Sequence, residues 1–393
     1  MEPFRLTLTI YPLGALLALC AVPCLVLTAY GMNRRCLKAG TAGWFALLCV
    51  PLAFLLARLG YCLMQLDLLI DDWGMLLRVT DGGFLLWGAL AGGLLAAWIT
   101  GRITGQKSGG IADSAVIPAL LLIIVGRVAC GFLFKDTGIG LDLESWFAPE
   151  ETDPALRYSL FAPENYSFFE RFPFAVKNYY DEWSWAVFVP EALWAAGIIL
   201  ILWRMKEPRP GGRTTLFLLL YAAGQVVLEA LLRGEVLHLP WLNFVRANQI
   251  LCGIAIVAVW AVCLHGSGVK TWKALAALAQ VIAAMGIVVA MEFAAFEKKI
   301  SFLETVPADV CHLIMLAACA WIVLAILPLW KRKYRDPLSA PIPRPDPVPA
   351  PALPAWQPER ALPALPAGEP ARKEKKGKKD KKKKDKKGKK KKK

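Results

Sequence analysis

Apolar runs, each close to the length of about twenty residues that a membrane helix needs, follow one another through the first 330 residues of this 393-residue chain. Inside lipid, every backbone N–H and C=O group needs a partner within the protein, so such runs form helices. Nine runs predict nine membrane-spanning helices and an all-α, polytopic helical bundle. The predicted spans are residues 9–31, 43–65, 83–100, 114–134, 184–203, 214–232, 247–265, 274–292 and 312–330.

The composition supports a membrane protein and argues against a soluble domain. Hydrophobic residues make up 56% of the chain, which includes 15 tryptophans, and the mean hydropathy is +0.46. Soluble domains are typically about 45–50% apolar. Ten cysteines are scattered singly, without a C-x-x-C pair or a Cys/His cluster. The sequence therefore predicts neither a disulfide framework nor a metal site, and no cofactor is expected.

Loop charges predict how the helices are oriented, because short loops rich in lysine and arginine stay in the cytoplasm. The first loop carries Arg34, Arg35 and Lys38, whereas the second and fourth loops lean acidic. Further basic residues mark the third, fifth and seventh loops: Arg102, Lys107, Arg204, Lys206, Arg209, Arg213, Lys270 and Lys273. We expect the N-terminus outside, the C-terminus in the cytoplasm and residues 135–183 as an extracytoplasmic head loop. The first span is expected to be a retained helix, because no positive region precedes it.

Arg127 is the most informative single residue, because it lies more than halfway along the fourth apolar span. An arginine at mid-membrane costs about 2.5–3.5 kcal/mol, and such residues usually face a bundle interior, a partner or an anionic ligand. In the predicted topology, further polar residues share its outer half of the membrane: Arg58, Glu191, Glu229, Arg233, Arg246, Asn248 and Gln249. Guanidinium groups bind phosphate oxygens bidentately. The convergence predicts a phospholipid headgroup site.

Some of these residues also have a purely structural interpretation. Arg233 is followed by Gly234 and Glu235, as at a helix end whose side chain reaches the interface. Arg58 could form a buried ion pair with Glu191 or Glu229 instead of binding phosphate. The Gly88-x-x-x-Gly92 pair is typical of close helix packing.

The order of these residues resembles that in prolipoprotein diacylglyceryl transferases. In the first half, the segments that carry the resemblance are Arg58-Leu59-Gly60-Tyr61, Gly82-Gly83-x-x-x-Trp87-Gly88, and Asp113 and Pro118 leading to Gly126-Arg127-x-x-Cys130. In the second half they are Glu191-Ala192-Leu193, Tyr221 through Glu229 to Arg233-Gly234, and Asn248-Gln249. The resemblance covers residues 9 to about 265, the first seven predicted spans.

The resemblance implies a bacterial plasma-membrane enzyme that moves diacylglyceryl from phosphatidylglycerol to the lipobox cysteine of a prolipoprotein, releasing glycerol phosphate. It implies catalytic roles for Arg127, Glu191 and Arg233. The phospholipid headgroup would be bound by Arg58, Arg127, Arg233, Arg246, Asn248 and Gln249.

This chain departs from the family pattern at the residues expected to transfer protons. Trp87 and Trp185 stand where the family has histidine, and Phe188 stands where it has glutamine. Cys130 replaces an asparagine and Lys135 replaces a glutamate. The three histidines of the chain, His238, His265 and His312, lie outside these motifs. Glu191 or Asp136 would act as the general base. Alternatively, the arginines would attract a substrate cysteine that is already a thiolate. The alternatives are a paralogue that acts on another nucleophile or lipid and a non-catalytic, phospholipid-binding paralogue.

Four regions are expected along the chain: a transferase-like membrane domain (1–268), two additional helices (269–335), a Pro/Ala-rich linker (336–370) and a disordered tail (371–393). No function is predicted for the two helices, and Glu292 and His312 are expected to be ordinary interfacial residues. The tail holds 17 Lys and Arg against 3 acids. It is predicted to bind anionic lipid, with RNA binding or simple solvation as alternatives.

Overall fold

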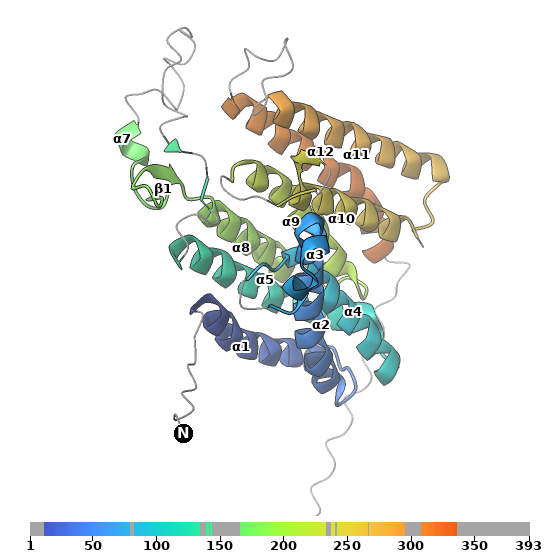
Figure 1. The fold of residues 1–393 in the computed structure, drawn as a ribbon. Helices are drawn as coiled ribbons and strands as arrows, with labels where there is room; N and C mark the ends of the chain where they lie inside the picture. The colour runs from blue at the N-terminus through green and yellow to red at the C-terminus, as the bar shows by residue number, and fades with distance from the viewer. Residues whose placement is uncertain are drawn as a thin grey trace, which may run out of the picture. The chain divides into compact units, whose positions relative to one another are not determined.

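In the computed structural model, most described residues belong to α-helices (Figure 1). The structure describes residues 12–78, 82–133, 139–140, 142–143, 166–232, 237–239, 242–265, 267–294 and 308–335. The predicted linker, the lysine-rich tail and most of the predicted head loop lie outside these residues.

Each of the nine predicted spans overlaps one long helix, which confirms the polytopic helical fold. These helices are α1 (Pro12–Arg34), α2 (Thr41–Met64), α4 (Leu86–Thr104), α5 (Ser108–Leu133), α8 (Phe188–Arg204), α9 (Gly212–Ala230), α10 (Ala247–Leu264), α11 (Thr271–Glu292) and α12 (Ala308–Tyr334). Seven of them, all except α8 and α9, are long and apolar enough to cross a membrane. Membrane crossing by α8 and α9 stays a prediction.

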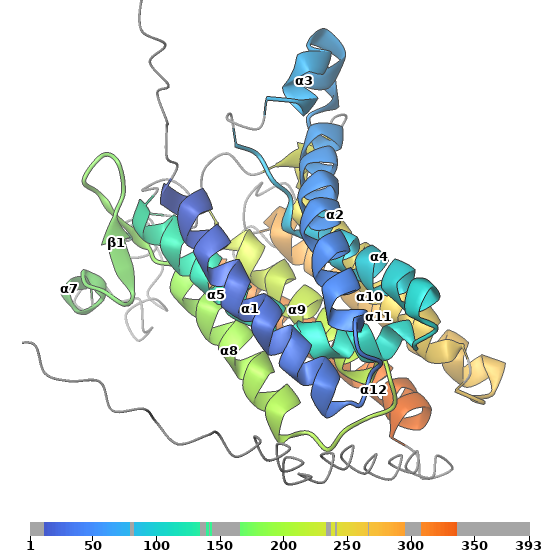
Figure 2. The same ribbon diagram turned by 90° about the horizontal axis from the view of Figure 1, so that it is seen from below.

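Helix α9 is the most enclosed of the long helices, with 14 of its 19 residues buried. It packs against α5, α8, α10 and α12. Helix α1 lies at the periphery on α5 (Figure 2). It exposes apolar side chains such as Leu19, Val22 and Val26. Because its neighbours shield α9 from lipid, this helix can carry Gln225 and Glu229 in its buried interior.

Helices α2 and α4 pack closely through the predicted glycine pair. A Cβ atom on Gly88 would lie 2.2 Å from the Leu56 carbonyl oxygen, and one on Gly92 would lie 2.4 Å from the Leu52 carbonyl oxygen. Only glycine allows the two backbones to approach this far. The structural interpretation of this pair is confirmed.

The shorter elements belong to the chain segments that connect the long helices. They are α3 (Leu66–Asp71), a 3₁₀ turn (Trp73–Leu76), α7 (Tyr166–Phe169), β1 (Ala175–Lys177), β2 (Trp183–Trp185), β3 (His238–Leu239) and β4 (Leu242–Arg246). Strands β1 and β2 form an antiparallel hairpin in which Ala175 is opposite Trp185. Its buried side packs with Leu143 and Phe169. This hairpin is the main described part of the predicted head loop.

Asp113, in the first turns of α5, caps the start of α9. The backbone N–H of Gly211 donates to Asp113 Oδ2 at 2.9 Å. The backbone N–H and hydroxyl of Thr214 donate to Oδ1 at 2.8 and 2.7 Å. The Arg35 guanidinium lies 3.7 Å from the same carboxylate. Since the first N–H groups of a helix lack helical partners, this carboxylate supplies acceptors that α9 needs.

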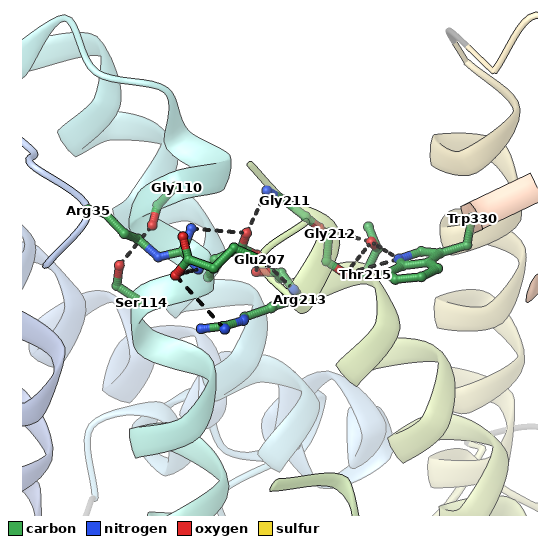
Figure 3. Close-up of polar contacts among 11 residues, drawn as sticks. Arg35, Gly110, Ser114, Glu207, Gly211, Gly212, Arg213, Thr215 and Trp330 are labelled. Carbon is green, nitrogen blue, oxygen red and sulfur yellow. Dashed lines mark hydrogen bonds and ion pairs between the residues drawn. The ribbon is translucent and has the colours of Figure 1, made fainter. Parts of the chain in front are cut away.

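Loops that are distant in sequence meet at the same end of α9. Glu207, in the α8–α9 connection, lies 3.9 Å from both Arg35 and Arg213. On the opposite side of the turn, the Trp330 indole of α12 donates to the Gly212 carbonyl at 3.0 Å (Figure 3). Loops predicted to share one side of the membrane therefore do meet. That this side is cytoplasmic remains a prediction from their charge.

We expect Asp113→Ala to lower the free energy of unfolding by about 3–5 kcal/mol, as is usual when one member of a buried ion pair is removed. The change leaves the Gly211 and Thr214 N–H groups and the Arg35 charge without this partner. Unfolding in detergent micelles titrated with sodium dodecyl sulfate measures the difference.

The matched control is Ser114→Ala, one residue further along α5. The Ser114 hydroxyl bonds only within its own helix, to the Gly110 carbonyl at 2.9 Å, among the contacts the structure describes. Its removal should cost no more than about 1 kcal/mol. Equal destabilisation by the two variants would contradict the capping role of Asp113.

Candidate functional site

A second polar cluster lies toward the other end of α9. Arg127 follows Asp113 by 14 residues in α5, which corresponds to about 21 Å along a helix. We call this group the Arg127 cluster; its members are Arg127, Glu191, Tyr221, Gln225, Glu229, Arg246, Asn248, Gln249 and Glu292. These side chains come from α5, α8, α9, α11 and the start of α10.

The Arg127–Glu191 ion pair is the centre of the cluster. Arg127 NH1 lies 3.4 Å from Glu191 Oε1, and the exposed fraction of the side chain is 24% for Arg127 and 2% for Glu191. Gln225 Nε2 donates to the same oxygen at 2.8 Å. The other oxygen, Oε2, is buried and has no hydrogen-bond partner among the described residues. One carboxylate oxygen thus fixes the arginine, and the second is left available.

Two aromatic residues pack next to this ion pair, Tyr221 beside Arg127 and Trp87 on Tyr221. The Tyr221 side chain lies beside the Arg127 guanidinium and is buried. The Trp87 ring packs on Tyr221, with ring centroids 6.0 Å apart. Trp87 occupies the position where the resemblance expects histidine. An indole has an N–H donor and no basic nitrogen, so Trp87 cannot accept a proton in place of that histidine.

The remaining predicted residues tie the start of α10 to the end of α9. Asn248 Nδ2 donates to Glu229 Oε2 at 2.5 Å. Arg246 NH1 donates to the backbone carbonyls of Glu229 and Leu232. Gln249 Nε2 lies 3.4 Å from the Val226 carbonyl. The structure therefore brings Arg246, Asn248 and Gln249 together as the sequence predicts.

Glu292, at the end of α11, joins the cluster from outside the predicted site. Its Oε1 lies 3.6 Å from Arg246 Nε, and its side chain is 20% exposed. Gln249 hydrogen-bonds the same carboxylate. The interfacial position expected for Glu292 stays a prediction, but its pairing with Arg246 within the bundle was not predicted. The sequence feature that could have pointed to this contact is that Glu292 is the single acidic residue of α11.

Arg58 is buried and holds a loop. Its guanidinium donates to the backbone carbonyls of four residues that precede α4: Met75, Arg78, Gly82 and Gly83. Glu191, one of its predicted partners, pairs with Arg127 instead. The role of Arg58 in binding phosphate stays a prediction. Arg233 and Asp136, two further predicted site residues, lie outside the described residues.

The described cluster can present cationic donors to an oxyanion. Arg127 is the most exposed of its arginines, at 24% against 13% for Arg246. A guanidinium has five N–H donors, so the contact with Glu191 leaves donors for a second anion. Within the described residues, no three His, Cys, Asp or Glu side chains converge to hold a metal ion. The chemistry that this geometry supports is anion binding beside a buried carboxylate.

Comparison with known proteins agrees with this arrangement. The family model for prolipoprotein diacylglyceryl transferase matches residues 3–265, which confirms the resemblance. The chain is 29% identical over 224 residues to the phosphatidylglycerol–prolipoprotein diacylglyceryl transferase of Gloeobacter violaceus, covering 55% of this chain and 72% of that protein. It is 25% identical over 249 residues to the protein of the same name from Listeria innocua, covering 62% and 81%. The chain therefore belongs to the prolipoprotein diacylglyceryl transferase family.

Proposed function

We propose that this protein transfers diacylglyceryl from phosphatidylglycerol to the cysteine thiol of a prolipoprotein, and that the Arg127 cluster is its active site. Family membership and the names of its relatives support this reaction. The observation that carries the site is the partly exposed Arg127, oriented by Glu191 inside a helical bundle. An arginine held in this way is preorganised to bind a phosphate group.

In the proposed reaction, Arg127 binds the phosphate of the headgroup. The thiolate sulfur forms a bond with the glyceryl carbon that carried the phosphodiester oxygen. The bond from that carbon to oxygen breaks, and glycerol phosphate leaves with the electron pair. The guanidinium stabilises the negative charge that grows on the leaving group, a preorganised electrostatic contribution. Asn248, Gln249, Arg246, Arg58 and Arg233 remain predicted headgroup contacts.

The thiol proton also needs an acceptor, and we propose Glu191. Its Oε2 atom, which has no hydrogen-bond partner among the described residues, belongs to the same buried carboxylate that contacts Arg127. A buried base within reach of a thiol can take its proton when the substrate binds. Arg127 would then have two tasks, because it binds the phosphate and also keeps Glu191 ionised.

The loop charges support a position of the proposed site in the outer half of the plasma membrane. The loops at the Asp113 end of the bundle carry the basic residues that favour the cytoplasm. The Arg127 cluster would then face the side from which an exported prolipoprotein presents its lipobox. This orientation has the N-terminus outside and the C-terminus in the cytoplasm.

The second candidate function is a phospholipid-binding protein without transferase activity. Trp87 favours this alternative, because it stands at the expected histidine and packs on Tyr221 beside Arg127. No histidine belongs to the Arg127 cluster as the described residues define it. The two functions share phospholipid binding and differ in whether Glu191 suffices as a base.

We expect the purified protein in phosphatidylglycerol micelles to add diacylglyceryl to a lipobox peptide and release glycerol phosphate. Arg127→Ala should lower the transfer rate by about 10²–10³-fold, the usual effect of removing one donor to a developing oxyanion. Peptide mass and glycerol-phosphate release measure the reaction, and equilibrium titration with short-chain phosphatidylglycerol measures binding.

Arg102→Ala is the matched control, because Arg102 lies in the last turn of α4 and stacks on Trp98 outside the cluster. It should leave transfer unchanged. Unaltered phosphatidylglycerol affinity in Arg127→Ala would contradict the headgroup site. A wild-type protein that binds phosphatidylglycerol and forms no product would favour the non-catalytic alternative.

The assignment of Glu191 as the base predicts a different pattern for Glu191→Gln. The amide keeps the shape of the carboxyl group and removes its basicity, so the maximal rate should fall by at least about 10²-fold, the usual contribution of a general base. Phosphatidylglycerol should still bind, because Arg127 remains and has lost its competing carboxylate. Steady-state kinetics separate the two effects. A variant with the wild-type maximal rate would show that another group takes the proton.

A further inference from the structure

Helices α11 and α12 lie beyond the residues that the family model matches, and yet they are part of the same bundle (Figure 1). Val281, Ala284 and Val288 of α11 belong to the same buried core as Cys252 and Ile256 of α10. Helix α12 packs on α9 and α10. Since α11 is held against this core, its last residue, Glu292, has a defined position at the Arg127 cluster.

Different groups fix the position of the Arg246 guanidinium and balance its charge. Two backbone carbonyls, from Glu229 and Leu232, accept from NH1 and fix where the guanidinium lies. Glu292 contacts the Nε side at 3.6 Å and supplies a full negative charge. Both side chains are largely buried, where charges interact more strongly than in water. Glu292 therefore matters for the charge of Arg246 more than for its place.

Counted with all groups ionised, the described cluster holds two arginines, Arg127 and Arg246, and three carboxylates, Glu191, Glu229 and Glu292. Their net charge is −1, and without Glu292 it would be 0. The helix outside the family match thus changes the charge that an incoming phosphate meets. The interaction energy is proportional to the charge of the ligand, so this change acts most on a headgroup with two negative charges.

We propose that Glu292 sets the anion selectivity of the Arg127 cluster. By neutralising Arg246, it favours phosphodiester lipids with a single negative charge over phosphomonoester lipids with a second one. The proposal rests on the proposed phospholipid site and adds a specificity-determining residue to it. In this role Glu292 acts through Arg246, as a positioning and charge-setting residue.

The test is equilibrium titration of the full-length protein in neutral detergent with two short-chain lipids, phosphatidylglycerol and phosphatidic acid. We expect Glu292→Gln to tighten binding about threefold for phosphatidylglycerol and about tenfold for phosphatidic acid, because one carboxylate charge is lost near the phosphate. In an Arg246→Gln background the same change should have a smaller effect on selectivity, because a buried carboxylate without its arginine partner tends to be neutral. Glu207→Gln, at the Asp113 end of the bundle, is the matched control and should bind both lipids as the wild type does.

Wild-type or weaker binding of both lipids by Glu292→Gln would overturn the proposal, since a merely structural ion pair predicts that result. A variant that fails to fold is replaced by Glu292→Asp, which lengthens the ion pair and should shift selectivity in the same direction by less. Transfer to a lipobox peptide is measured in the same samples. Changed selectivity without any transfer would contradict the proposed function and support this inference. Transfer with unchanged selectivity would support the proposed function and contradict the role of Glu292. A wild-type protein that binds neither lipid would contradict both proposals.

Discussion

The ion pair between Arg127 and Glu191 is the interaction on which the arrangement of this bundle depends. A lone arginine this deep in a membrane costs about 2.5–3.5 kcal/mol, and an unpaired buried carboxylate is costly as well. Pairing them requires α5 and α8 to lie together, and the Gln225 amide that supports Glu191 requires α9 beside them. Helix α9 can supply that amide because its neighbours keep it away from lipid.

The two ends of α9 show how similar residue types serve different purposes. At Asp113, both carboxylate oxygens accept hydrogen bonds from the first turn of α9, so this group is fully engaged in holding helices together. At Glu191, one oxygen is engaged and the other is unpartnered among the described residues, beside a partly exposed arginine. The first arrangement is closed, whereas the second still has donors and an acceptor for a substrate.

Sequence alone could predict the helices and the proximity of Arg127 and Glu191, because both depend on position along the chain. Apolar length determines the spans, and depth within a span places Arg127 near Glu191. The partners of Arg58 depend on the path of the loop before α4, which hydropathy does not describe. Glu292 was missed for a related reason, since its contact with Arg246 depends on how α11 is rotated and packed against α10. The contacts of Arg58 and Glu292 are set by packing between segments distant in sequence, which a local sequence pattern does not describe.

The most direct measurement of the central claim is an experimental structure of the protein in nanodiscs of phosphatidylglycerol. The proposed site predicts a headgroup phosphate at a hydrogen-bond distance of about 2.9 Å from the Arg127 guanidinium, inside the bundle and beside Glu191. Phosphatidylglycerol bound only at the outer surface, with Arg127 contacting Glu191 and no lipid, would contradict the account and leave the ion pair a purely structural feature.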